Sequence, residues 1–272
     1  MKIGYTPQLH RVRRSCRVTP LSQGAGLTDE QLLTCYVVQR DPDAFQALVR
    51  RHGPMVFGVC LRRLPSAGLA EIALQATFLA LAQNARSVRP RAMLARWLYH
   101  AACTTALVAA NGQRQPGPSL DAEVCRLPKK YRIPFILCQL AKKTVKEAAR
   151  ELDWTQDVLV ERLSKAKRML GHRLIRSTEP LTRQALAASL DEMTAPAVPT
   201  ESLCSATAQA AASRVSKATP VSPTVASLTR RTLRRMLLQK VTLGARLVFS
   251  IGLISIGLAE LLYVLFATNA GG

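Results

Sequence analysis

The sequence predicts an all-α protein with two small helical domains, a flexible tether and one C-terminal transmembrane helix. Apolar residues recur at helical spacing between Thr28 and Leu174, and residues that cap helices separate the runs. Residues 179–227 are rich in Ala, Ser, Thr and Pro and have few large apolar side chains, so we expect them to form the tether. Residues 247–267 contain one charged residue, Glu260, and are long enough to span a bilayer as a helix.

The composition favours polyanionic partners and gives no sign of catalysis. The chain has 272 residues and a formal net charge of +21, which favours binding to nucleic acid and anionic lipid. The seven cysteines are odd in number and include no CxxC pair, so we expect reduced, mostly buried thiols and no metal site. The sequence has no P-loop or nucleophile constellation, so we expect neither an enzyme nor a cofactor.

The first domain, over residues 27–110, opens with two well-marked helix starts. Thr28 and Gln31 have the spacing of a capping box, in which each side chain bonds the other residue's backbone amide. Asp41–Pro42 then supplies an N-cap followed by a proline at the first helical position. We expect the helix that begins there to be interrupted near Gly53–Pro54.

A third helix of this domain, at about residues 69–83, is apolar on more than one stripe. A helix with one solvated face keeps that face polar, so this pattern leaves two readings. Either the helix is fully buried, or part of it contacts a partner protein.

Basic residues are interleaved with aromatic residues at the end of the first domain. Guanidinium groups hold phosphates while rings stack on exposed bases, so this pattern suits single-stranded DNA. The alternative is that the two aromatic residues belong to the core of an amphipathic helix. The expected DNA-contacting residues are Arg89, Arg91, Arg96, Trp97 and Tyr99.

The second domain, over residues 120–178, has the pattern of a helix-turn-helix. After a break at residues 141–143, Thr144 and Glu147 form a capping box that starts a helix of about two turns. A longer helix from Thr155 or Gln156 then places Leu159, Leu163, Ala166 and Leu170 on one face. Such a second helix enters the DNA major groove, whereas the alternative is an ordinary three-helix bundle. The expected DNA-contacting residues are Lys143, Thr144, Gln156, Asp157, Glu161, Ser164, Lys165 and Arg168.

Two sequence blocks resemble a known family. LPKKYRIPFILCQL, KEAARELDW and RLSKAKRMLGHRL resemble the C-terminal promoter-reading domain of extracytoplasmic-function (ECF) RNA polymerase sigma factors. AFQALVRRHGPMVFGVC, LQATFLALA and RPRAMLARWLYHAACTTAL resemble the N-terminal domain of the same family. Together the blocks cover roughly residues 28–176. The resemblance implies a region 2-like domain that binds polymerase and the promoter's −10 element, and a region 4-like domain that reads the −35 element.

The resemblance also implies which residues meet polymerase, and the sequence departs from the family at two places. The implied polymerase-binding residues are Glu71, Gln75, Phe78 and Leu79. Family members usually carry several acids before the QATF motif, whereas here only Glu71 remains. Where relatives commonly have Gly-Thr-Val-Lys-Ser, this chain has Asp157 and Glu161 at the ends of the segment. A carboxylate can accept from a cytosine amino group, so these acids predict an altered base preference.

The segments outside the two domains predict a membrane protein. Six Lys and Arg residues precede the apolar run and none follows it, so the positive-inside rule places the body of the chain in the cytoplasm. The alternative is a buried C-terminal core helix. The expected segments are a basic flexible arm at 1–26, a linker at 111–119, the tether at 179–227, a basic juxtamembrane segment at 228–246 and the transmembrane helix at 247–267.

The sequence therefore predicts a membrane-tethered sigma factor in the bacterial inner membrane, with a single membrane span. Its expected partners are core RNA polymerase, promoter DNA and the membrane, with an anti-sigma factor or an intramembrane protease as candidate regulators. The alternative is a degenerate sigma-fold protein that acts as a DNA-binding regulator or scaffold at the membrane without productive polymerase binding.

Overall fold

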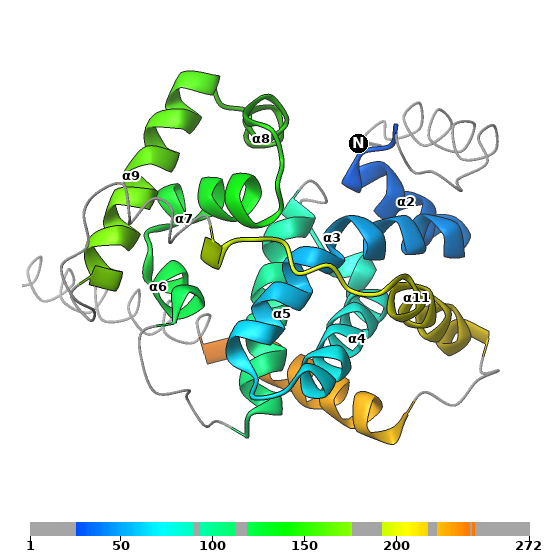
Figure 1. The fold of residues 1–272 in the computed structure, drawn as a ribbon. Coiled ribbons are helices and arrows are strands. Elements are labelled where there is room, and N and C mark those ends of the chain that lie inside the picture. Colours follow the sequence, from blue (N-terminus) through cyan, green and yellow to red (C-terminus); the bar gives the residue numbers. More distant parts are fainter. Residues whose placement is uncertain are drawn as a thin grey trace, which may run out of the picture. The chain divides into compact units, whose positions relative to one another are not determined.

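The computed structural model shows a helical protein (Figure 1). It describes residues 26–89, 93–111, 119–175, 192–216, 222–239 and 241–242. Every regular element in these ranges is a helix, which confirms the all-α prediction for this part of the chain. The chain divides into one compact unit over Met1–Thr232 and a second over Leu233–Gly272.

The first helix, α2 (Asp29–Gln39), begins at the capping box that the sequence predicts. The Thr28 amide donates to Gln31 Oε1 at 2.8 Å, and the Gln31 amide donates to Thr28 Oγ1 at 3.3 Å. The helix ends at Arg40, which adopts a left-handed conformation with φ of 58°. Reciprocal bonding of two otherwise orphaned amides therefore fixes the start of α2.

Helix α3 (Pro42–Arg63) starts at the predicted N-cap, where Asp41 Oδ1 accepts from the Asp43 amide at 2.9 Å. The predicted interruption at Gly53–Pro54 is wrong, because α3 runs through it without a break. In a helix a proline ring clashes with the carbonyl four residues back and with the Cβ of the residue before it, and Gly53 lacks that Cβ. Burial of α3 residues on both sides of Pro54 offsets the hydrogen bond that the proline removes.

Helices α4 (Ala67–Asn84) and α5 (Leu94–Ala109) pack with α3 to form the core. A short 3-10 turn, η2 (Ala85–Ser87), follows α4. Three aromatic rings link the core helices: the Tyr36 and Phe45 centroids lie 4.6 Å apart, and those of Phe45 and Phe78 lie 6.4 Å apart. Their burial, and that of the aliphatic residues around them, supplies most of the driving force for this part of the fold.

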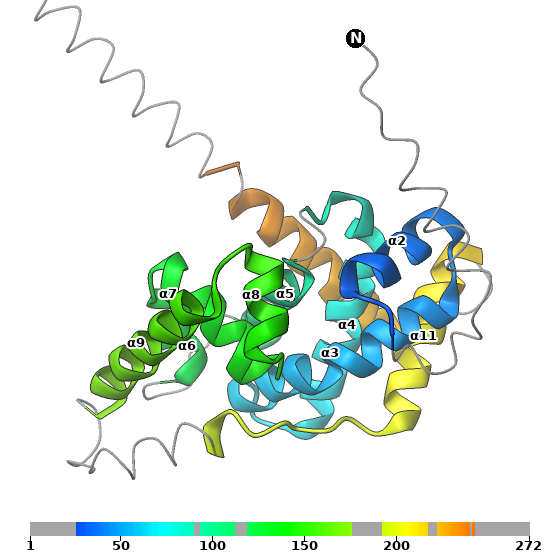
Figure 2. The same cartoon turned by 90° about the horizontal axis from the view of Figure 1, so that it is seen from above.

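The second sequence block folds into short helices followed by one long helix (Figure 2). The break before α8 includes Lys142 at a φ of 54°, and the predicted capping box of Thr144 and Glu147 is confirmed. Asp153, with a φ of 55°, ends α8 in a left-handed turn. The elements are α6 (Leu120–Arg126), α7 (Lys129–Phe135), the π-helical turn η4 (Ile136–Leu140), α8 (Val145–Leu152) and α9 (Gln156–Ile175).

The segment for which composition predicts a tether differs from that expectation at residues 201–216. These residues form α11 (Glu201–Ser216), which packs against α3 and α4 (Figure 1). Residues 223–239 are also helical. Few large apolar side chains are needed here, because α11 is buried mainly through small ones that allow a close approach. The buried residues of α11 include Leu203, Cys204, Ala208 and Ala211.

Several predicted segments lie wholly or almost wholly outside the described residues: the arm at 1–26, most of the linker at 111–119, and the transmembrane helix at 247–267. Within the part of the chain that the structure describes, no helix combines the length and apolar character needed to cross a membrane.

Candidate nucleic-acid interface

The long helix α9 is divided into a buried face and an exposed face, as its sequence predicts. Leu159, Ala166 and Leu170 are fully buried, and Leu163 is half-buried. The predicted groove-facing residues all lie on the solvent side, so they are free of the core and reachable by a ligand. These exposed residues are Gln156, Asp157, Glu161, Ser164, Lys165 and Arg168.

Contacts around Trp154 fix α9 relative to α8. The Trp154 amide donates to the Ala149 carbonyl at 3.0 Å, which closes the turn after α8. The guanidinium carbon of Arg162, on α9, lies 4.0 Å from the centre of the Trp154 ring. This cation–π contact and the shared apolar cluster with Leu137 and Leu159 hold the two helices as one body.

A basic pair flanks Tyr131 beside the exposed face of α9. Lys165 Nζ lies 5.5 Å from the centre of the Tyr131 ring, and Lys130 Nζ lies 5.1 Å from it. Hydrogen bonding with Lys165 lowers the pKa of the Tyr131 hydroxyl. The mostly buried ring therefore lies between the ammonium groups of two exposed lysines, one on α7 and one on α9, and these two charges are available to a phosphate.

The residues predicted to contact single-stranded DNA differ in how exposed they are in the structure. Arg89 and Arg96 are exposed, Trp97 is half-buried against the core, and Arg91 lies outside the described residues. Tyr99 is 2% exposed, and its hydroxyl donates to Asp121 Oδ1 at 3.0 Å. Burial and this acidic neighbour raise the pKa of Tyr99. Tyr99 is therefore a core residue in this structure, as the alternative reading expects, and its contact with DNA stays a prediction.

The residues of α4 that are expected to bind polymerase also differ in exposure. Phe78 and Leu79 are fully buried, Gln75 is half-buried and Glu71 is exposed. Phe78 packs against Phe45 inside the core. Of the two readings of this apolar helix, burial is therefore confirmed for Phe78 and Leu79, and only Glu71 and Gln75 are open to a partner.

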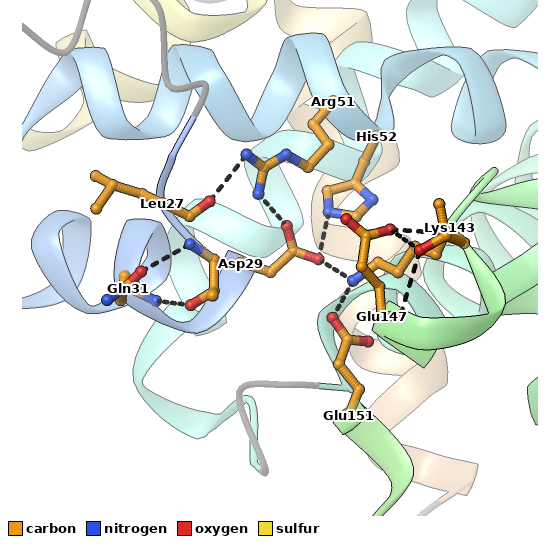
Figure 3. Close-up of polar contacts among 10 residues, drawn as sticks. Leu27, Asp29, Gln31, Arg51, His52, Lys143, Glu147 and Glu151 are labelled. Carbon is orange, nitrogen blue, oxygen red and sulfur yellow. Dashed lines mark hydrogen bonds and ion pairs between the residues drawn. The ribbon is translucent and has the colours of Figure 1, made fainter. Parts of the chain in front are cut away.

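A buried carboxylate, Asp29, joins the first sequence block to the turn before α8 (Figure 3). Asp29 Oδ1 accepts from Arg51 Nη1 at 2.8 Å. Asp29 Oδ2 lies 3.1 Å from His52 Nε2 and accepts from Lys143 Nζ at 2.6 Å. Lys143 also donates to Glu151. Burial by itself raises the pKa of Asp29, but His52 and Lys143 outweigh it and hold the pKa far below its usual range.

This network gives Lys143, a predicted DNA contact, two carboxylate partners within the protein. Its side chain is 11% exposed, so a phosphate reaches it only after these contacts break. Thr144 is exposed but bonds Glu147 in the capping box. Sequence reasoning missed Asp29 because an acid just after an N-cap is already explained by the helix dipole.

A second buried carboxylate, Asp121 on α6, makes a similar connection to α3 and α5. Arg62 Nε donates to Asp121 Oδ2 at 3.0 Å, and Arg62 Nη2 donates to Oδ1 at 3.1 Å. Asp121 also accepts the Tyr99 hydroxyl and is fully buried. The two sequence blocks are thus packed together through paired buried charges within the first compact unit.

The cysteines are mostly as the sequence predicts. Cys60, Cys103 and Cys204 are buried free thiols, whereas Cys35 is disulfide-bonded, so the expectation of reduced thiols is wrong at Cys35. A hydrogen bond with Cys103 lowers the pKa of Cys125 to about 7. Among the described residues, no group of three His, Cys, Asp or Glu side chains is arranged to hold a metal ion.

Comparison of the sequence with models of known protein families gives no match, and comparison with curated proteins gives no significant match.

Proposed function

We propose that this chain is an ECF-type sigma factor, which directs RNA polymerase to specific promoters and is held at the bacterial inner membrane by its C-terminal helix. The observation that carries the proposal is the exposed polar and basic face of α9 behind the capped helix α8. It occurs in a chain whose two sequence blocks resemble, in order, the two conserved domains of that family.

In this proposal α9 enters the major groove of the −35 element. Gln156, Asp157 and Glu161, near the start of α9, meet base edges, while Lys165 and Arg168 meet phosphates. The exposed Arg89 and Arg96 contact the backbone of the −10 element. Because Lys143 is paired with Asp29, its contact with DNA requires the two sequence blocks to move apart.

The decisive experiment is capture of core RNA polymerase by the full-length chain, followed by transcription from promoters selected with the reconstituted holoenzyme. We expect a stable complex that gains promoter-specific initiation, and loss of capture with Glu71→Arg, which reverses the charge of an exposed residue on α4. Glu30→Arg, an exposed acid on α2, is the matched control. Specific DNA binding by a folded chain that never captures polymerase would contradict the proposal.

The second candidate is a sigma-fold regulator or scaffold at the membrane without productive polymerase binding. The burial of Phe78 and Leu79 favours it, because these residues offer no surface to a partner in this conformation. The loss of acids before QATF favours it as well. The two candidates differ in one outcome. The regulator binds duplex DNA by itself, and adding polymerase does not change its DNA binding.

A further inference from the structure

We propose that residues 192–216 and 222–232, here called the covering segment, act as an internal ligand of α3 and α4 that weakens the binding of polymerase to α4. This inference rests on the proposed function, because it concerns the regulation of the same helix. The covering segment lies after both sequence blocks that resemble sigma factors, and the described part of it packs on the first block.

The first support is the buried face of α11. Ala211 is fully buried, and Cys204 and Ala208 are 4% and 6% exposed. These residues belong to the same apolar cluster as the core of α3 and α4. Ala206, also on α11, is exposed. The helix therefore has one covered side and one free side, as expected for a docked element.

The second support is the close approach of the covering segment to α3. A Cβ added to Gly53 would lie 3.2 Å from Pro199 Cγ, and one added to Gly58 would lie 3.9 Å from Ala197 Cβ. Arg62 Nη1 donates to the Met193 carbonyl at 3.3 Å. Gly53 thus leaves the space in which Pro199 lies, whereas Ala197 is only within ordinary contact distance of Gly58, and the Arg62 donor fixes the path of the segment.

The third support is a set of polar contacts between the covering segment and helices α3 and α4. Arg50 on α3 pairs with Glu201 at the start of α11, with Nη2 to Oε1 at 2.6 Å. Farther along the segment, Thr229 Oγ1 lies 3.5 Å from the Ala76 carbonyl of α4, and Val225 and Leu228 are buried in the same cluster. Contacts to α3 and α4 therefore come from both α11 and residues 223–232.

The apolar character of α4 fits a helix that is covered within its own chain. The half-buried Leu69 and Ile72 stand where relatives carry acids before QATF, and both pack against the core cluster. When a helix is covered within its own chain, apolar residues at these positions stabilise the fold through burial. When the same positions face solvent and a partner protein, acidic residues are favoured instead. The departure from the family pattern is then an adaptation to the covering segment.

The covering segment and the predicted membrane helix occupy different parts of the chain, so cleavage can remove one without the other. The covering segment precedes the predicted membrane helix, so cleavage after Thr232 releases the body from the membrane and leaves α4 covered. Full access of polymerase to α4 requires cleavage before residue 192 or displacement of the segment, so the full-length chain captures polymerase more weakly than a chain whose segment is displaced. Release from the membrane and competence for polymerase are therefore distinct steps.

The test compares Ala208→Arg with Ala206→Arg in the full-length chain, purified in mild detergent. A buried arginine without a partner is strongly unfavourable, so Ala208→Arg should detach α11, whereas Ala206→Arg points to solvent. Two readouts are measured: amide hydrogen exchange in α4, and capture of core RNA polymerase. We expect Ala208→Arg to raise both, with at least about a tenfold gain in capture, which corresponds to 1.4 kcal/mol, and Ala206→Arg to match the unmodified chain.

A charge swap keeps the test informative if Ala208→Arg unfolds the chain, which circular dichroism would reveal. Glu201→Arg sets two like charges against each other at an exposed pair and should raise capture about two- to fivefold. Arg50→Glu combined with Glu201→Arg should restore the original capture. Absence of this rescue would overturn the inference.

The remaining outcomes separate the two proposals. Unchanged exchange in α4 of a folded Ala208→Arg chain would overturn the covering inference. Equal polymerase capture by all variants would overturn it as well and leave the proposed function standing. Raised exchange in α4 without capture by any variant would contradict the proposed function, and with it the claim that the segment withholds α4 from polymerase.

Discussion

Lys143, in the turn before α8, donates to Asp29 Oδ2 in the first turn of α2 at 2.6 Å, across 114 residues of sequence. Asp29 is 3% exposed, so its charge depends on the cations around it. The same ammonium group is a predicted DNA contact. The contact that stabilises the packing of the two sequence blocks therefore also keeps this lysine from binding DNA.

We predict that Asp29→Asn lowers the free energy of unfolding by about 3 to 5 kcal/mol, because it removes the buried carboxylate charge that pairs with the mostly buried Lys143 ammonium and with the partly exposed Arg51. The folded-state pKa of Asp29 is depressed, so its contribution is complete above the ordinary aspartate pKa of about 4 and is lost as pH falls below it. Urea unfolding of both chains from pH 7 to pH 3 measures this. The difference between them should be constant down to about pH 5 and shrink below about pH 4.

Asp43→Asn is the matched control, because Asp43 is exposed in the first turn of α3. It should change the free energy of unfolding by less than about 1 kcal/mol. A pH-independent difference between the original chain and Asp29→Asn would show that shape, and not charge, explains the role of Asp29.

We predict that Tyr99→Phe destabilises the fold without weakening DNA binding. The substitution removes one hydrogen bond to the buried Asp121 carboxylate, which is worth about 2 kcal/mol for a charged acceptor. Thermal unfolding and titration with single-stranded DNA are the two measurements. A loss of DNA affinity at unchanged stability would show that the Tyr99 hydroxyl contacts DNA.

Local features were predictable because a few neighbouring residues decide them. The capping box at Thr28 and the one at Thr144 each involve hydrogen bonds across three residues. The N-cap at Asp41 has the same short range. The exposed face of α9 also followed from spacing alone, since burial of one stripe leaves the opposite side to solvent.

Long-range pairs were not predictable from the same patterns. The Arg62–Asp121 and Arg50–Glu201 contacts span 59 and 151 residues, and nothing local marks either partner. The docking of α11 was missed for a different reason. Its alanines carry little apolar area each, so their burial against α3 and α4 depends on close packing of the whole helix, which residue spacing alone does not reveal.

We predict that phosphate contacts of α9 dominate DNA affinity. Lys165→Ala and Arg168→Ala should each weaken binding to all sequences and reduce the slope of log affinity against log salt by about 0.9. Arg126→Ala is the control, because Arg126 is paired with Glu123 on α6. Fluorescence anisotropy between 50 and 200 mM salt, roughly the range over which such contacts are released, gives the slopes. Parallel slopes for all chains would place Lys165 and Arg168 away from the DNA.

We predict that Glu161→Ser tightens DNA binding and changes base preference. Glu161 is exposed on α9, where its charge repels phosphates and its carboxylate accepts from cytosine. Glu30→Ser makes the same charge change on the exposed surface of α2 and should alter only the general affinity. Selection of bound duplexes from a random pool measures the preference. Identical selected sequences for both variants would place Glu161 outside the groove.

We predict that membrane association has two separable parts. Deletion of residues 247–272 removes the predicted transmembrane helix but keeps the bases at Arg234, Arg235, Lys240 and Arg246. Each base near an anionic surface contributes about 1 kcal/mol, so this chain should bind anionic vesicles at low salt and leave them at high salt. A chain ending at Thr232 should lose most of this remaining association while keeping α11 in place. Vesicle flotation at two salt concentrations measures both parts. Salt-resistant flotation of the chain that lacks residues 247–272 would show that the anchor lies elsewhere, because a peripheral basic segment cannot hold a protein on lipid once its charges are screened.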